Sequence, residues 1–144
     1  MRTALVKPQT FYLEVTSDMA NLAKVADFVL DAARQGHLTQ KQTDDVHMAV
    51  DEAVTNVMEH GYAGRTDGRI SIKCRIDERE FFVEIRDNGK PFDASKIKTP
   101  NTKTPLSKRA IGGLGIFFMR KLMNKVEFTR DNAGNITRMY KKLK

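Results

Sequence analysis

Alternating apolar and polar residues predict five β-strands. Residues 11–15 place Phe, Leu and Val at every second position, which is the period of a half-buried strand. Two longer alternating segments, residues 69–76 and 80–87, are joined by three polar residues and predict an antiparallel hairpin. Residues 126–130 and 136–142 flank the turn sequence DNAGN and predict a second hairpin.

Apolar residues at spacings of three and four predict the helices. One helix runs from residue 17 or 18 to about residue 35, and a second from 39 to 60, each followed by a glycine. Thr39 and Gln42 match a capping box at the start of the second helix. A short third helix covers 112–124. This order of elements predicts a single α+β domain: a two-layer sandwich in which one mixed, mostly antiparallel sheet is covered on one face by helices.

Composition is typical of a soluble globular protein. Of the 144 residues, 40% are hydrophobic and 30% are charged. The longest nearly apolar run, AIGGLGIFFM, is far shorter than the ~20 residues needed to cross a bilayer. The N-terminal segment carries no apolar signal sequence, and the lone Cys74 excludes an internal disulfide and a multi-cysteine zinc site. We therefore expect a cytoplasmic protein, not bound to a membrane, with Cys74 filling the core.

Net charge leaves several partners open. Lys and Arg total 25 against 18 Asp and Glu, a net charge of +7. Such a charge suits a nucleic acid, an acidic protein or a polyphosphate ligand. Neither an RNA-binding motif with interleaved aromatic residues nor a zinc-finger spacing accompanies it. Charge alone does not choose between these partners.

The second helix carries a row of polar side chains beside its apolar arc. At about 100° per residue, Glu52, Asn56 and Glu59 fall within about 60° of one another, with His60 at the edge of the arc. An ordinary solvated helix face explains such a row. The alternative is a row of oxygen and nitrogen groups that faces a cleft beside the core.

Asp87 continues the apolar face of its strand. It is in phase with Phe81, Val83 and Ile85, so alternation points its carboxylate toward the side that these residues bury. A buried carboxylate is costly unless hydrogen-bond donors meet it. One interpretation is a strand that ends in an Asp-Asn-Gly turn. The other is a carboxylate that accepts a hydrogen bond from the exocyclic amine of a flat ligand, with Gly89 leaving room for the ring.

Residues 94–110 break every period. They contain two prolines, three threonines and five basic residues without an acidic one, which indicates a long loop of the kind that forms lids or binding loops. Glycines at 112, 113 and 115 then open a helix, and the exposed N–H groups of a helix start favour phosphate. The spacing matches neither a P-loop nor a dinucleotide fingerprint.

Three segments in this order resemble a known superfamily over nearly the whole chain. EAVTNVMEHGY, DNGKPFD and GGLGI are similar to the asparagine box and the two glycine boxes of the GHKL (Bergerat-fold) ATPases. The Glu52-to-Asn56 spacing and the sequence GGLGIFFMRKLMNKVEF resemble the bacterial anti-sigma-factor serine/threonine kinases. The resemblance implies one ATP-binding domain over residues 1–144, with a lid at about 94–111.

The resemblance also implies roles for individual residues. Glu52 is the expected general base, and Asn56 the expected Mg²⁺ ligand. ATP is expected to contact Asp87 and Gly89 through its adenine, and Lys108, Arg109, Gly113, Leu114 and Gly115 through its phosphates, with Thr137 as a further contact. The sequence departs from the superfamily at two places: Ile111 stands where a glycine is usual, and Gly134-Asn135-Ile136 stands where many relatives carry Gly-Thr-Thr.

The implied function is an ATP- and Mg²⁺-dependent serine/threonine protein kinase. Its expected substrate is a STAS-type anti-sigma-factor antagonist, and the resemblance also implies sigma-factor sequestration and a homodimer. The alternative is a non-catalytic module in which the nucleotide gates partner binding, and Glu52 separates the two because binding alone requires no base. Direct nucleic-acid binding would rest on net charge only and is not expected.

Overall fold

The chain folds into one sheet with helices on one side of it. The structure, a computed structural model, describes residues 7–91 and 113–144. The sheet has the order β1-β2-β3-β5-β4, and every neighbouring pair is antiparallel. The strands are β1 (Gln9–Thr16), β2 (Arg69–Ile76), β3 (Glu80–Asp87), β4 (Lys125–Asp131) and β5 (Gly134–Lys142). Both predicted hairpins are confirmed.

The α+β class is confirmed, whereas the expected mixed sheet is wholly antiparallel in the described strands. Helices α1 (Leu22–Gln35) and α2 (Gln40–Asn56) both lie between β1 and β2 in the chain. Because two helices that run in opposite directions separate these strands, the chain re-enters the sheet antiparallel to β1. No parallel crossover results.

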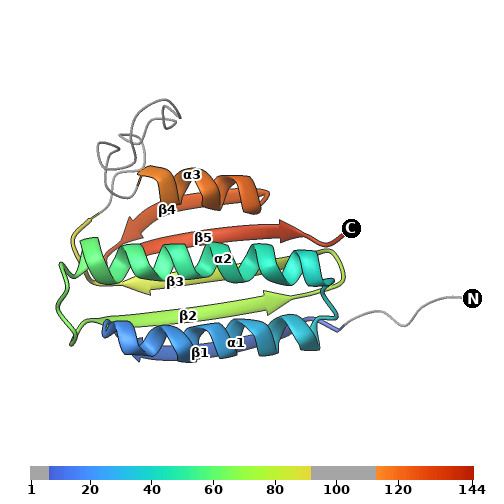
Figure 1. Ribbon diagram of the computed structural model, residues 1–144, viewed down its shortest axis with the longest axis horizontal. Coiled ribbons are helices and arrows are strands. Elements are labelled where there is room, and N and C mark those ends of the chain that lie inside the picture. Colours follow the sequence, from blue (N-terminus) through green and yellow to red (C-terminus); the bar gives the residue numbers. More distant parts are fainter. Residues whose placement is uncertain (1–6, 92–112) are drawn as a thin grey trace, which may run out of the picture.

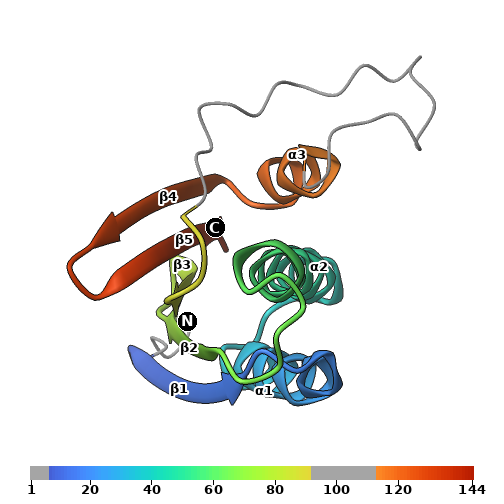
Figure 2. The ribbon, with the colours of Figure 1, turned by 90° about the vertical axis from the view of Figure 1, so that its left-hand side faces the viewer.

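The helices form the second layer. Figures 1 and 2 show α1, α2 and α3 (Gly113–Leu122) on the same side of the sheet, with α2 in the middle. The predicted capping box is confirmed, since Gln42 N donates to Thr39 Oγ1 at 3.1 Å and Thr39 N to Gln42 Oε1 at 2.9 Å. A 3₁₀ turn, η1 (Met19–Asn21), precedes α1, and Asp18 caps it by accepting from Ala20 N.

The core lies between the two layers. Phe81, Val83 and Ile85 of β3 are fully buried, as their alternation predicts. Cys74 on β2 is also fully buried, and burial raises the pKa of its thiol to about 12, so it fills the core as predicted. Across residues 7–91 and 113–144, no helix has both the length and the apolar character required to cross a membrane.

Candidate functional site

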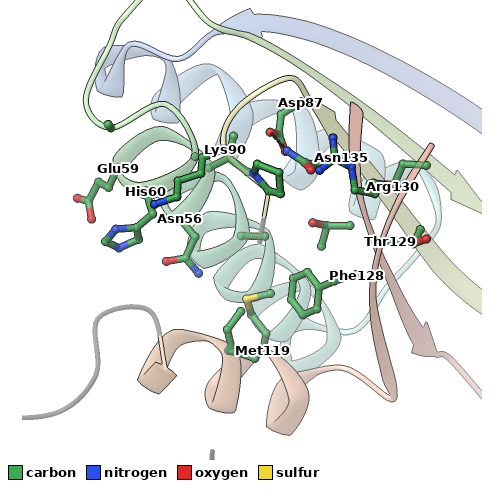
Figure 3. A pocket seen from close by; sticks show the side chains of 18 residues that line it. Asn56, Glu59, His60, Asp87, Lys90, Met119, Phe128, Thr129, Arg130 and Asn135 are labelled. Atoms are coloured by element: carbon green, nitrogen blue, oxygen red, sulfur yellow. Dashed lines mark hydrogen bonds between the residues drawn. The ribbon is translucent and has the colours of Figure 1, made fainter. Parts of the chain in front are cut away.

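A cavity of about 990 Å³ opens at one end of the sandwich. The C-terminal part of α2, the loop after β3, α3, β4 and β5 supply its walls (Figure 3). Apolar side chains, among them Ile116, Met119 and Phe128, line one part of it. Polar side chains line the rest, among them Asn56, Asp87, Lys90, Asn135 and Thr137. A largely apolar cavity with a few convergent polar groups is typical of a small-molecule site.

The sheet register explains why polar groups gather there. In the β3–β5 ladder Val83 faces Met139, Ile85 faces Thr137, and Asp87 faces Asn135. The residues of these three pairs share one face of the sheet, because side chains two apart along a strand point to the same side. Val83 and Ile85 are buried, so this is the face that the helices cover. The inward side chains therefore change from apolar to polar toward the same end of the two strands.

Asp87 is buried but keeps one oxygen for another group. The residue is 6% exposed, and its Oδ1 accepts from Gly89 N at 2.8 Å and from Asn135 Nδ2 at 2.9 Å. Oδ2 accepts no hydrogen bond from residues that the structure describes. The two interpretations of Asp87 are thus compatible, because the Asp-Asn-Gly turn uses one oxygen and leaves the other at the cavity.

Gly89 is needed for a reason other than the expected one. A Cβ atom at this position would lie 2.6 Å from the carbonyl carbon of Gly61 and 2.7 Å from its oxygen. Lys90 N donates to that oxygen at 2.7 Å. The absent side chain therefore lets the loop after β3 pack against the end of the second helix, and the space is filled by protein backbone.

The second helix changes type before its end. It was predicted to reach His60 as one helix, but α2 ends at Asn56 and a π-helical turn, η2 (Val57–Gly61), follows. Single π turns are frequent at functional sites. This turn carries Glu59 and His60, both of which line the cavity.

Asn56 does not lie on a solvated face, so that alternative is wrong for this residue. Its Nδ2 is buried and has no hydrogen-bond partner among residues 7–91 and 113–144. A buried polar atom without a partner costs about 1–3 kcal/mol, and such atoms are rare in folded proteins. Asn56 also lines the cavity. A bound group at this place would therefore satisfy a side chain that the described chain leaves unsatisfied.

The same side chain suits a magnesium–nucleotide complex. The two ends of an amide have nearly the same shape, so a half-turn would present Oδ1 in place of Nδ2. Carbonyl oxygens are ligands that Mg²⁺ accepts, and this ion usually takes few protein ligands beside phosphate oxygens and water. The residues present thus fit the metal implied by the sequence.

Glu52 lies one turn before Asn56 and contacts α3. A Cβ atom at Gly115 would come within 2.6 Å of Glu52 Oε2 and 3.5 Å of Asn56 Nδ2, so the first turn of α3 packs on both side chains. Glu52 is not among the residues that line the cavity, whereas Asn56, one turn later in the helix, is. Burial, followed by the negative charges of Asp51 and Glu59, raises the pKa of Glu52 above the usual 4.5.

The other predicted site residues divide into two groups. Thr137 is 7% exposed and lines the cavity, while the backbone of Gly113, Leu114 and Gly115 forms the start of α3. Lys108, Arg109 and the predicted lid at 94–111 lie outside the described residues.

Sequence reasoning missed several cavity residues, among them Asn135, Lys90 and Arg130. Asn135 was noted only as a departure from the superfamily, although it stands directly opposite Asp87 in the ladder. Lys90 and Arg130 also line the cavity, and neither forms an ion pair with the described residues. The available signal was strand alternation, which places Asn135 and Thr137 on the face of β5 that Asp87 shares.

Comparison with known proteins agrees with this architecture. Residues 15–141 match the family described as the histidine kinase-like ATPase domain. A serine-protein kinase RsbW from Listeria innocua serovar 6a is 32% identical over 109 residues, which cover 73% of this chain and 69% of that protein. An anti-sigma F factor from Clostridium novyi is 38% identical over 110 residues, 74% of this chain and 75% of that protein.

Solved structures support the fold. The RsbU and RsbW domains of Rv1364c from Mycobacterium tuberculosis match with a TM-score of 0.68 and 14% identity, over 94% of this chain and 32% of that one. A histidine kinase domain from Erythrobacter litoralis EL346 matches with a TM-score of 0.52 and 15% identity, over 86% of this chain and 60% of that one. The chain therefore belongs to the histidine kinase-like (GHKL) ATPase family, in its branch of anti-sigma-factor serine kinases. This family uses ATP.

Proposed function

We propose that this protein is a Mg²⁺- and ATP-dependent serine/threonine kinase whose substrate is a STAS-type anti-sigma-factor antagonist. We further propose that it binds a sigma factor, acts as a homodimer and forms one kinase domain over residues 1–144. The observation that carries the proposal is the pairing of Glu52 with Asn56, one helical turn apart, against the first turn of α3. The names of its relatives, serine-protein kinase RsbW and anti-sigma F factor, support it.

The nucleotide is assigned to the cavity at the end of α2. Asp87 Oδ2 is an acceptor for the adenine amine, and Thr137 lines the same part of the cavity. The N–H groups at the start of α3, from Gly113 to Gly115, suit the phosphates because a helix start favours anions. Lys108 and Arg109 are proposed to close onto the phosphates from the lid.

Asn56 is assigned to the metal. Mg²⁺ bound through its amide oxygen would supply charge neutralisation to the phosphate oxygens. The packing of α2 against α3 supports this assignment, because it holds the Asn56 side chain beside the start of α3. Phosphoryl transfer depends more on such positioning than on covalent catalysis.

Glu52 is assigned the role of general base. The oxygen of the acceptor serine or threonine attacks the γ-phosphorus, the bond to the bridging oxygen breaks, and ADP leaves. The hydroxyl proton moves to the Glu52 carboxylate. A raised pKa increases the basicity of the deprotonated carboxylate, and burial beside Asp51 and Glu59 provides it.

The experiment that tests this function follows labelled phosphate from ATP onto candidate STAS-type proteins. The unmodified chain is expected to label serine or threonine. Glu52→Gln keeps the size of the side chain but weakens its basicity, so transfer should slow at least about a hundredfold while ATP affinity stays unchanged. Asp44→Asn, which removes an exposed carboxylate about two turns earlier in the same helix, is the matched control and should transfer at nearly the unmodified rate.

Two outcomes would count against the assignment. Full transfer by Glu52→Gln would exclude Glu52 as the base. ATP binding without transfer to any STAS-type protein would favour the alternative, a nucleotide-gated binding module without catalysis.

A further inference from the structure

Helices α2 and α3 lie side by side and run in opposite directions (Figures 1 and 2). The start of α3 meets the C-terminal part of α2, because a Cβ atom at Gly115 would lie 2.6 Å from Glu52 Oε2. The end of α3 lies near the N-terminal part of α2, because Lys141 Nζ donates both to the carbonyl oxygen of Leu122 at 2.6 Å and to Asp45 Oδ2 at 2.8 Å. We call the line of contact between the two helices the α2–α3 seam.

Two large apolar side chains border this seam on its solvent side. Met48 of α2 is 55% exposed and Phe118 of α3 is 47% exposed. At about 100° per residue, Met48 lies about 40° from Glu52, on the side away from the buried Ala49. Phe118 lies about 60° from Gly115, on the side away from the buried face of α3. The two side chains therefore form one apolar surface over the seam, the Met48–Phe118 surface.

This surface lies one helical turn from Glu52. Met48 precedes Glu52 by four residues, about 6 Å along the helix axis. Glu52 is only partly buried and is not among the residues that line the cavity. With the nucleotide in the cavity, an acceptor hydroxyl therefore reaches the Glu52 carboxylate from the solvent side of the seam.

The distance of one turn limits what covers the surface during the reaction. A helix with its side chains is about 10 Å wide, which exceeds the separation of about 6 Å between Met48 and Glu52. The part of the acceptor that brings the hydroxyl to Glu52 therefore also covers the Met48–Phe118 surface. Any other partner seated there would keep the acceptor away from Glu52.

The chemistry of the two side chains suits contact with a protein. Single exposed hydrophobic side chains are normal, but neighbouring ones beside polar groups mark interaction sites. Methionine and aromatic residues are enriched at the centres of protein interfaces. A small, charged ligand would gain nothing from these two side chains.

We infer that the Met48–Phe118 surface docks the phosphoacceptor protein by receiving an exposed apolar side chain that lies near its serine or threonine. The inference rests on the proposed function, because it assigns the surface that holds the substrate on which Glu52 acts. The apolar side chain of the acceptor lies about one helical turn, roughly 6 Å, from the reacting hydroxyl. Docking here sets the affinity for the acceptor and takes no part in the chemical step.

The test separates docking from chemistry by steady-state kinetics. The probe is the STAS-type protein that the unmodified chain labels most strongly, varied in concentration at saturating Mg²⁺ and ATP. Met48→Gln and Phe118→Gln keep good helix formers at exposed positions. Each should lower kcat/KM for the acceptor at least about fivefold through KM, while kcat and ATP affinity stay within about twofold of the unmodified protein.

A double-mutant cycle shows whether the two surfaces touch. Alanine replaces the exposed apolar residue of the acceptor that lies nearest the labelled hydroxyl. It should lower kcat/KM to a similar extent with the unmodified kinase and little further with Phe118→Gln. Fully additive effects would contradict the contact.

Controls separate this inference from the proposed function. Tyr12→Ser removes a side chain that is 74% exposed on the other face of the sheet, and it should leave KM unchanged. An unchanged KM in folded Met48→Gln and Phe118→Gln proteins, checked by circular dichroism, would overturn the inference alone. A weaker dimer in light scattering with unchanged KM would assign the surface to a second copy, and weaker ATP binding to the nucleotide site. Absence of labelling of every STAS-type protein by the unmodified chain would overturn the proposed function and this inference with it.

Discussion

The two ends of α2 differ in whether their buried polar groups have hydrogen-bond partners. Near the N-terminal end, Asp45 is 5% exposed and accepts from Lys41 Nζ at 2.7 Å and from Lys141 Nζ at 2.8 Å. Lys141 also donates to the carbonyl oxygen of Leu122, at the end of α3, at 2.6 Å. Near the C-terminal end, Asn56 Nδ2 has no partner in the described chain.

Two carboxylates of the same helix, Asp45 and Glu52, have pKa values shifted in opposite directions. Burial raises the pKa of Asp45, but the hydrogen bonds and charges of Lys141 and Lys41 outweigh it and lower the pKa below the usual 3.8. Burial also raises the pKa of Glu52, and there the neighbouring carboxylates Asp51 and Glu59 raise it further. A polar group that its own chain satisfies stabilises the fold, whereas one left unsatisfied beside a cavity indicates a ligand.

Among substitutions at the two ends of α2, the one at Asn56 is expected to have the largest effect, and this effect is on ATP affinity. Asn56→Ala removes the proposed metal ligand, so the Mg²⁺-dependent part of ATP affinity should fall at least about tenfold. The free energy of unfolding should change by less than about 1 kcal/mol, because Nδ2 forms no hydrogen bond that the substitution would break. Calorimetry with and without Mg²⁺, together with urea unfolding, measures both quantities. Loss of the fold, with ATP affinity lost only through unfolding, would assign Asn56 a structural role.

A smaller effect is expected at Lys141, and there it should be on the stability of the fold rather than on ATP affinity. Lys141→Met should lower the free energy of unfolding by about 1 kcal/mol and leave ATP affinity unchanged, because Lys41 still pairs with Asp45. Lys142→Met, at the next and exposed position of β5, should have almost no effect. Equal destabilisation by the two substitutions would remove the Asp45–Lys141 pair from the account.

Acid should abolish the difference caused by Lys141. A depressed pKa in the folded state means that the Asp45 pair stabilises the protein above the unfolded-state pKa, near 3.8. This contribution is lost as the pH falls through the lower, folded-state pKa. The unfolding free energies of the unmodified and Lys141→Met proteins should therefore converge in strong acid, and a constant gap would contradict the pairing.

The smallest effect concerns the pH dependence of phosphate transfer. Glu52 must be deprotonated to act as a base, so the rate should decline as the pH falls through its pKa, which burial holds above 4.5. The slow residual transfer of Glu52→Gln should lack this decline. The same acid limb in both proteins would mean that another group titrates.

The sequence predicted the fold well because alternation and capping are local signals. The limits of the segments 69–76 and 80–87 were correct, and the capping box at Thr39 formed as predicted. The mixed sheet was wrong because strand direction depends on how α1 and α2 together return the chain. The site was harder to predict from the sequence. Asn135 lies beside Asp87 only because of the strand register, which pairs the two residues across β3 and β5. The role of Gly89 likewise depends on a distant backbone contact with Gly61.

One measurement tests the central claim, that ligand binding completes the unsatisfied end of α2. The side-chain amide signals of asparagines can be followed by ¹H–¹⁵N NMR during a titration with Mg²⁺ and ATP. The signals of Asn56 should shift as the nucleotide binds. Those of Asn21, whose Nδ2 already donates to the backbone oxygen and Oγ1 of Thr16, should stay in place. ATP binding with unmoved Asn56 signals would contradict the account.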